Sequence, residues 1–311
     1  MKWNRILAVL LLYCQLSHAQ EDTSGVITVE SKTVLAEVVV RSDLNVRNFL
    51  KRIKNDTTFY KAFKNLRVLS YTSLNDIRML DKKGREKASL QSKTRQVRTA
   101  GCRTMDVLEE KSTGDMYAKD RSFNYFTAQL YAGLFFTSGK VCGENNIVNG
   151  IEHSAKNTSG LEKHKEQLKM LFFNPGKKIP GIPFIGNKLD VFDADVAQYY
   201  DYEIDMGELN GQWCYQFSIK AKPDLTTSEK SNIVFDNITT WFNAKTFEIV
   251  GRNYDLSYNA AVYNFDVHME VLMTKFGDYL VPQLLRYRGY WDVVFKKQER
   301  GLFTATLYDF K

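Results

Sequence analysis

Histidines are the first residues that could carry chemistry, and three remain once residues 1–19 are set aside as an expected signal peptide: His153, His164 and His268. They lie far apart in the sequence, and none belongs to an HExxH or C-x-x-C pattern of the kind that binds zinc. His268 falls on the more polar face of an expected strand, where solvent or a hydrogen-bond partner normally satisfies the ring. We therefore predict no metal site and no catalytic histidine.

Carboxylates are the second candidates. Asp190, Asp193 and Asp195 form a small acidic cluster before an expected strand. The loop glycine and closing glutamate of an EF-hand are missing, so turn formation is the simpler interpretation. Acidic residues are also plentiful on the expected strands, where a pair could serve a glycoside or ester hydrolase. The sequence selects no pair, because the separation that matters is three-dimensional.

Motifs for the common nucleophiles and cofactors are missing from the sequence. There is no G-x-S-x-G, no P-loop and no dinucleotide fingerprint. We therefore predict no catalytic residue and no cofactor, and we expect no nucleic-acid partner.

The segment 174–187 is the strongest candidate for a functional surface, because it alternates proline and glycine with bulky apolar residues. Apolar side chains beside lysines suit a lid or a loop that touches a membrane surface. The alternative is an Ω-like connection packed by its own side chains. The candidate ligand-binding residues are Phe172, Phe173, Ile179, Ile182, Phe184 and Ile185, and the candidate membrane-surface residues are Lys177 and Lys178.

Aromatic residues make up 13% of the chain and are frequent in its last third. Most should form the core and cross-strand pairs. The sharper hypothesis is an apolar cavity between a curved sheet and its helices, suited to an acyl chain or another apolar ligand.

Three cysteines remain after residue 19: Cys102, Cys142 and Cys214. An exported chain with three can close one disulfide and leave one thiol, and we expect Cys102 to pair with Cys142 because both lie in the same irregular third of the chain. The alternative is three buried, reduced thiols, since cysteine packs well as a small apolar group.

Residues 1–19 predict export. Lys2 and Arg5 precede an apolar run at 6–13, and Ser17-His18-Ala19 supplies small residues for cleavage after Ala19. The run is shorter than the roughly 20 residues that span a bilayer. A lipoprotein signal using Cys14 is the alternative, and the bulky residue before that cysteine disfavours it. The expected destination is the periplasm, the cell envelope or the extracellular space.

The formal net charge of +7 falls to +5 when the two basic residues of the signal leave with it. Basic residues gather at 51–64 and 78–98, which we interpret as solvated faces of a helix and a strand. The alternative is contact with an anionic lipid surface or another polyanion.

The periodicity of the remaining chain predicts the elements that would position these residues. A flexible lead-in at 20–33 and a strand at 35–40 precede helices beginning near residues 44 and 57. A hairpin turns at 81–84, and a helical or irregular insertion covers about 100–195, with a helix at 162–173. Eight strands are expected at 199–206, 213–220, 233–242, 247–256, 263–275, 279–289, 291–299 and 302–310.

A strand at 35–40 after a signal peptide, then a short helix and an aromatic-rich meander, resembles uncharacterised exported envelope proteins of Bacteroidetes. The order of helix and long strands over residues 44–311 also resembles the lipoprotein-carrier (LolA/LolB-like) half-barrel family. That resemblance implies a periplasmic location and an apolar cavity for lipid. Residues 100–195 depart from the family as a large insertion, so no functional residue is carried over.

The sequence therefore predicts an α+β fold, mostly antiparallel β, in which a curved sheet or half-open barrel packs on two or three helices. Residues 34–311 should form a single β-rich domain. We expect a non-enzymatic envelope protein that binds an apolar ligand or lipid between sheet and helices, with a membrane surface as a second partner. The alternatives are a hydrolase using strand carboxylates and an interaction module without a small ligand.

Overall fold

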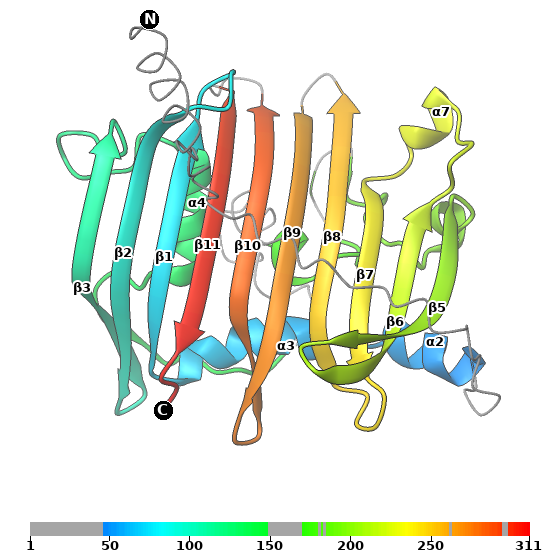
Figure 1. The fold of residues 1–311 in the computed structure, drawn as a ribbon, viewed down its shortest axis with the longest axis horizontal. Helices are drawn as coiled ribbons and strands as arrows, with labels where there is room; N and C mark the ends of the chain where they lie inside the picture. The colour runs from blue at the N-terminus through cyan, green and yellow to red at the C-terminus, as the bar shows by residue number, and fades with distance from the viewer. Residues whose placement is uncertain (1–45, 149–169, 180–181, 183–184, 261–262, 294–297) are drawn as a thin grey trace, which may run out of the picture. The chain divides into compact units, whose positions relative to one another are not determined.

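The computed structural model describes residues 46–148, 170–179, 182, 185–260, 263–293 and 298–311. The expected fold class is confirmed, because these residues form an open, mostly antiparallel sheet with a few helices (Figure 1). The expected signal peptide 1–19, lead-in 20–33 and strand 35–40 lie outside the described residues, as do His153, His164 and Phe184.

Eleven strands form one sheet in the order β4-β3-β2-β1-β11-β10-β9-β8-β7-β6-β5. The order follows the chain except at one seam, where β1 pairs antiparallel with β11 and joins the N-terminal strands to the C-terminal meander. The strands are β1 (Tyr71–Leu80), β2 (Glu86–Thr99), β3 (Cys102–Gly114), β4 (Val141–Cys142), β5 (Tyr200–Leu209), β6 (Gln212–Ala221), β7 (Phe235–Asn243), β8 (Ile249–Ala260), β9 (Tyr263–Phe276), β10 (Tyr279–Val293) and β11 (Glu299–Tyr308).

Helices cover one face of this sheet (Figure 1). Apolar and polar residues alternate on β9, where Val267, Met269 and Val271 are buried and the intervening His268 and Glu270 are half-buried. The buried face packs in one core cluster with apolar side chains of α2, α3 and α4. The helices are α2 (Val46–Lys54), α3 (Thr58–Asn65), the 3-10 helix η1 (Leu66–Val68), α4 (Phe126–Phe135), α6 (Ala194–Ala197) and α7 (Thr227–Lys230), and residues 170–173 are also helical.

Two tight turns show why the hairpins were predictable. Asn210 and Gly211 join β5 to β6 with φ of 51° and 72°, the left-handed pair that a two-residue type I′ turn requires. Gly84, at φ 78°, closes the predicted turn between β1 and β2. No helix within the described ranges is long and apolar enough to cross a membrane.

Two expectations about the elements are wrong. The strands expected at 279–289 and 291–299 are one strand to Val293, because Gly289 stays in register with Val267 of β9 and Gly301 of β11. Residues 102–114 are β3, paired along their length with β2, and not part of an irregular insertion. Most β3 side chains are exposed on both faces, so the strand carries no apolar alternation that the sequence could reveal.

Candidate ligand-binding site

An apolar pocket lies between α4 and strands β9, β10 and β11. Its cavity volume is about 30 Å³, and no polar atom is exposed to it. Pockets for small ligands typically have mainly apolar walls. The lining residues are Thr127, Leu130, Tyr131, Leu134, Phe135, Phe172, Met269, Leu285, Tyr287, Trp291 and Phe303.

α4 forms one wall because its pocket-facing residues recur with helical spacing. Leu130 and Tyr131 follow Thr127 by three and four residues, and Leu134 follows them by four and three, which places all four on one side of the helix. The Tyr131 ring packs on Phe303 of β11 at 5.0 Å between centroids. α4 falls within the expected helical or irregular insertion, and the structure shows that this part of it is a helix.

The N-terminus of α4 is fixed by a carboxylate from the sheet. Glu299, at the start of β11, accepts hydrogen bonds from the backbone N–H groups of Phe126 and Thr127, both at 2.8 Å, and from the Thr127 hydroxyl at 2.6 Å. Tyr125, the N-cap residue, provides no side-chain cap. Glu299, 9% exposed, therefore satisfies the free N–H groups of the first turn and complements the helix dipole.

The opposite wall depends on a glycine in β10. Tyr287 stacks on Phe303 with centroids 4.8 Å apart, and the indole N–H of Trp291 donates to the Tyr287 hydroxyl at 2.5 Å. A Cβ at Gly289 would lie 1.8 Å from that hydroxyl oxygen, so the absence of a side chain at this position lets the Tyr287 ring lie flat on the strand.

Polar groups in the pocket walls are bonded within the protein. The Tyr131 hydroxyl donates to Asn75 Oδ1 at 3.2 Å, and the Thr127 and Tyr287 hydroxyls are bonded as described. Burial raises the pKa of Tyr131 and of Tyr287 far above the usual range for a phenol. Both therefore stay neutral, and the walls suit a hydrocarbon.

A second pocket, which we call the basic pocket, adjoins the first. Its cavity volume is about 60 Å³, and it shares Leu134 and Phe135 with the apolar pocket. Its lining carries three cations and no acidic residue. The lining residues are Tyr60, Phe63, Lys64, Leu66, Arg67, Tyr71, Arg103, Gly133, Leu134, Phe135, Phe136 and Phe173.

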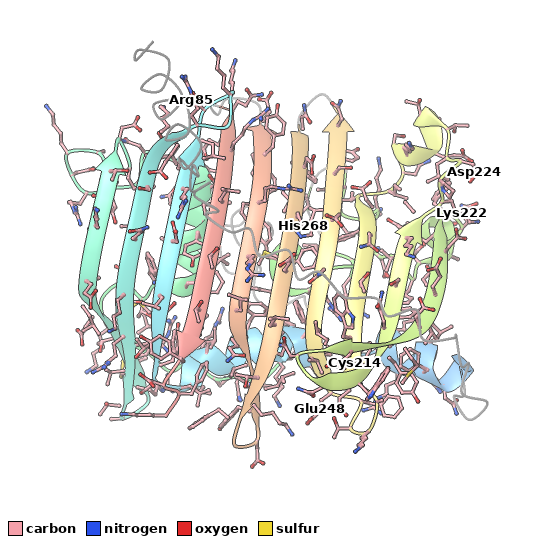
Figure 2. The ribbon with its side chains drawn as sticks, viewed as in Figure 1. Arg85, Cys214, Lys222, Asp224, Glu248 and His268 are labelled. Carbon is pink, nitrogen blue, oxygen red and sulfur yellow. A yellow bond between two sulfur atoms is a disulfide. The ribbon has the colours of Figure 1, made fainter. Side chains whose placement is uncertain are left out.

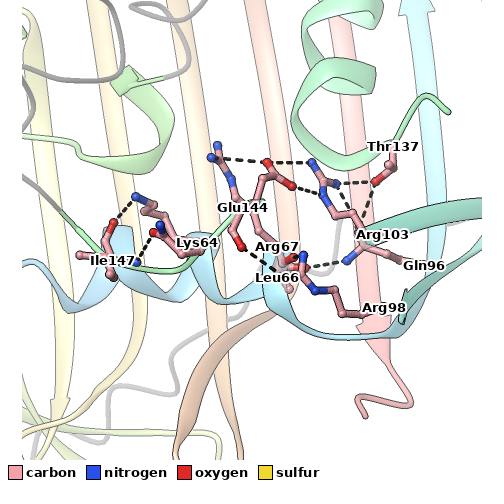
Figure 3. Close-up of polar contacts among 10 residues, drawn as sticks. Lys64, Leu66, Arg67, Gln96, Arg98, Arg103, Thr137, Glu144 and Ile147 are labelled. Carbon is pink, nitrogen blue, oxygen red and sulfur yellow. Dashed lines mark hydrogen bonds and ion pairs between the residues drawn. The ribbon is translucent and has the colours of Figure 1, made fainter. Parts of the chain in front are cut away.

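Arg103 is held firmly in the wall of the basic pocket (Figure 3). Its guanidinium bonds both carboxylate oxygens of Glu144, at 2.5 and 3.2 Å, and donates to Gln96 Oε1 at 3.1 Å and to the Thr137 hydroxyl. Gln96 is fully buried, and its amide donates to the carbonyl oxygen of Leu66 at 2.6 Å. This network fixes Arg103 with its donors largely used.

Lys64 and Arg67 are held more loosely in the same pocket. Arg67 Nη1 lies 3.7 Å from Glu144 Oε1, and the Arg67 side chain is 41% exposed. Lys64 donates to the carbonyl oxygen of Ile147, and its ammonium lies 5.8 Å from the centre of the Tyr60 ring. Burial, and then repulsion by Arg67, lowers the pKa of Lys64, while Glu144 acts in the opposite direction.

The disulfide joins Cys102 of β3 to Cys142 of β4, which is the pairing expected from the sequence. Cys102 directly precedes Arg103, and Cys142 lies two residues before Glu144. The disulfide therefore joins the two segments that form the Arg103–Glu144 ion pair. Cys214 is buried as a free thiol, and burial raises its pKa to about 11.

The structure separates the residues that the sequence proposed around segment 174–187. Phe172 lines the apolar pocket and Phe173 the basic pocket. Ile179, Ile182 and Ile185 are buried in the core, as the Ω-like alternative expects, and line neither pocket.

The two candidate membrane-surface lysines differ in their surroundings. Lys177 is half-buried, donates to the carbonyl oxygen of Lys54 and lies 5.1 Å from the centre of the Phe192 ring, whereas Lys178 is exposed. The neighbouring Ile179, Ile182 and Ile185 are buried and therefore present no apolar surface to a membrane.

Other candidates have local roles. Asp193 caps α6 by accepting from the Asp195 backbone N–H, and Asp190 accepts from the Phe192 N–H, which agrees with turn formation. No group of residues suited to hold a metal occurs in the part of the chain that the structure describes. His268 on β9 (Figure 2) lies between two strand carboxylates that its ring binds.

His268 Nδ1 lies 2.6 Å from Asp255 Oδ1, and His268 Nε2 lies 3.2 Å from Glu270 Oε1. Hydrogen bonds to Asp255 and then to Glu270 raise the pKa of His268 to about 9, so the ring is a cation at neutral pH. Both carboxylates are bound to that cation, and they provide no support for the hydrolase alternative.

Sequence reasoning missed Lys64, Arg67, Arg103, Glu144 and Glu299. They come from α3, η1, β3, the segment after β4 and β11, and they meet through strand pairing and the disulfide. The cluster of basic residues at 51–64 was the one sequence feature that pointed to any of these five residues, and it includes only Lys64.

No family model matches this chain, and no curated protein matches it. Among solved structures it aligns with a DUF1329 family protein from Desulfovibrio piger at 12% identity over 82% of this chain and 93% of that chain, with a TM-score of 0.24. A putative outer membrane lipoprotein-sorting protein domain from Vibrio parahaemolyticus aligns at 9% identity over 81% and 88%, with a TM-score of 0.27. Lipovitellin aligns at 9% identity over 78% of this chain and 25% of that chain, with a TM-score of 0.29. Alignments with these identities and TM-scores establish no shared function.

Proposed function

We propose that this protein is a non-enzymatic binding protein that holds one acyl-chain-like ligand in the apolar pocket between α4 and β9–β11. The observation that carries the proposal is a pocket lined mainly by aliphatic and aromatic side chains, whose walls expose no polar atom. Water in such a space finds no hydrogen-bond partner, whereas each methylene group moved there from water contributes about 0.8 kcal/mol.

Two features support binding in the periplasm or the cell envelope. One is the signal peptide expected at residues 1–19, which would direct the chain there. The Cys102–Cys142 disulfide supports this placement, because disulfides persist mainly in oxidising compartments outside the cytosol.

Trp291 supplies a direct test, since its indole forms part of the pocket wall and is 4% exposed. The fluorescent fatty acid cis-parinaric acid accepts energy from tryptophan, most efficiently from the nearest ring. Titration of the full chain with this probe should show saturable energy transfer at one equivalent, and dodecanol should displace the probe.

Matched variants locate the probe. Trp291→Phe should lower the transfer more than Trp213→Phe, at a tryptophan 58% exposed on β6. Transfer that does not saturate, or that survives in Trp291→Phe and is lost in Trp213→Phe, would place the probe elsewhere and refute the proposal.

A further inference from the structure

We infer that the ligand of this site is an anionic amphiphile: its acyl chain occupies the apolar pocket, and its carboxylate or phosphate head group binds Lys64 and Arg67 in the basic pocket. This inference rests on the proposed function and adds the chemical class of the ligand. The juxtaposition of the two pockets carries it.

The two pockets adjoin each other. Leu134 and Phe135, at the end of α4, line both. The consecutive residues Phe172 and Phe173 line one pocket each. A molecule that spans both pockets would meet hydrocarbon surface at one end and cations at the other, which is the pattern of a fatty acid or a lipid phosphate.

The charges in the basic pocket are unequally satisfied. Arg103 and Glu144 are joined at 2.5 Å and are both largely shielded, with 17% and 20% of their side chains exposed. Arg67 lies 3.7 Å from a carboxylate that already binds Arg103, and its guanidinium has five N–H donors. Donors of this kind bind carboxylates and phosphates, often in pairs.

The position of Lys64 favours an anion for a second reason. Its cation is partly removed from water and repelled by Arg67, the two causes that lower its pKa. An anion between the two side chains would replace part of the lost hydration and reduce the repulsion. A neutral head group provides neither effect, and a cationic head group adds a third repelling charge.

The experiment compares probes that share a twelve-carbon chain and differ in the head group. Displacement of cis-parinaric acid from the full chain is measured with dodecanoate, dodecyl phosphate, dodecanol and dodecyltrimethylammonium at neutral pH. Hydrogen bonds to charged groups contribute more free energy than bonds between neutral groups. We therefore expect the two anions to bind about tenfold more tightly than dodecanol, and the cation to bind most weakly. Comparing carboxylate with phosphate identifies the preferred head group.

Charge reversal at Arg67 has a matched control on the neighbouring strand. Arg95 is exposed on β2, beside the buried Gln96 and therefore on the opposite face of the sheet. Arg67→Glu should weaken the binding of dodecanoate by about tenfold or more and leave the binding of dodecanol unchanged. Arg95→Glu should change the affinity for neither ligand. Arg67→Gln provides a second variant that removes the charge without reversing it.

The outcomes separate this inference from the proposed function. If none of the twelve-carbon probes binds, the proposed function itself fails. If dodecanol binds as tightly as dodecanoate and both Arg67 variants leave dodecanoate binding unchanged, the head-group assignment fails and the proposed function stands. Acetate and inorganic phosphate should displace cis-parinaric acid only weakly. If either one displaced the probe as well as its twelve-carbon counterpart, the inference that the ligand is an amphiphile would be refuted.

Discussion

The attachment of α4 to the sheet by Glu299 gives the sharpest prediction about stability. Replacing Glu299 with glutamine keeps the size of the side chain and removes its charge. Glutamine has one accepting oxygen, and its NH₂ group would face a backbone N–H that the carboxylate now accepts from. The substitution therefore disturbs a hydrogen-bonded cap and leaves the surrounding hydrocarbon packing in place.

The magnitude follows from the three hydrogen bonds, at 2.8, 2.8 and 2.6 Å, that end on this carboxylate. Bonds to charged groups contribute about 1.5–3 kcal/mol each, and glutamine should lose the equivalent of two at the lower end of that range. We expect the free energy of unfolding to fall by about 3 kcal/mol. In a chain of this size the melting temperature should fall by about 6 °C.

Urea unfolding followed by circular dichroism measures this change, with Glu248→Gln as the control. Glu248 forms a 2.6 Å ion pair with Lys275 in which both side chains are more than 40% exposed, and Figure 2 labels its position. Exposed pairs contribute about 0–1 kcal/mol, so the control should change little. Equal urea midpoints for Glu299→Gln and Glu248→Gln would contradict the role assigned to Glu299.

Three further predictions concern other parts of the fold. His268 has a pKa raised from 6.5 to about 9, so its stabilising effect is complete below pH 6.5 and is lost as the pH rises through about 9; the wild-type urea midpoint should fall over this interval, and that of His268→Gln should fall less. Cys102→Ser opens a disulfide with a sequence separation of 40 and should lower the free energy of unfolding by about 4 kcal/mol. A reductant should lower the urea midpoint of the wild-type protein for the same reason, and an unchanged midpoint would contradict this prediction. Gly289→Ala should displace the Tyr287 ring, destabilise the fold by about 1–3 kcal/mol and weaken probe binding, whereas Gly207→Ala, where the nearest atom is 3.7 Å from the new Cβ, should do neither.

The C-terminal strands were predictable because three local signals agree there. Alternation on β9, the Asn210–Gly211 turn and the short links each favour an antiparallel meander. The error at 289–291 arose where a glycine that normally marks an interruption accommodates an aromatic ring. β3 was missed because its exposed residues leave no apolar pattern.

The candidate site was predictable to a much smaller extent, because non-local contacts build it. An apolar cavity between sheet and helices is a reasonable expectation from aromatic content, and Phe172 and Phe173 line the two pockets. Nothing in the spacing of Lys64, Arg67 and Arg103 indicates that they meet. Their meeting depends on the pairing of β1, β2 and β3 and on the short segment that the disulfide fixes.

The location of α4 over the β1–β11 seam connects ligand binding with the stability of the sheet. Its Tyr131 bonds to Asn75 of β1, and its N-terminus bonds to Glu299 of β11, so α4 contacts both strands of the seam. A ligand at 100 times its Kd should raise the free energy of unfolding by about 2.7 kcal/mol if it binds the folded state alone. If α4 is a wall of the site, Glu299→Gln must lose both stability and affinity for cis-parinaric acid. A variant that loses stability and binds the probe as tightly as wild type would show that α4 supports the seam without forming the site.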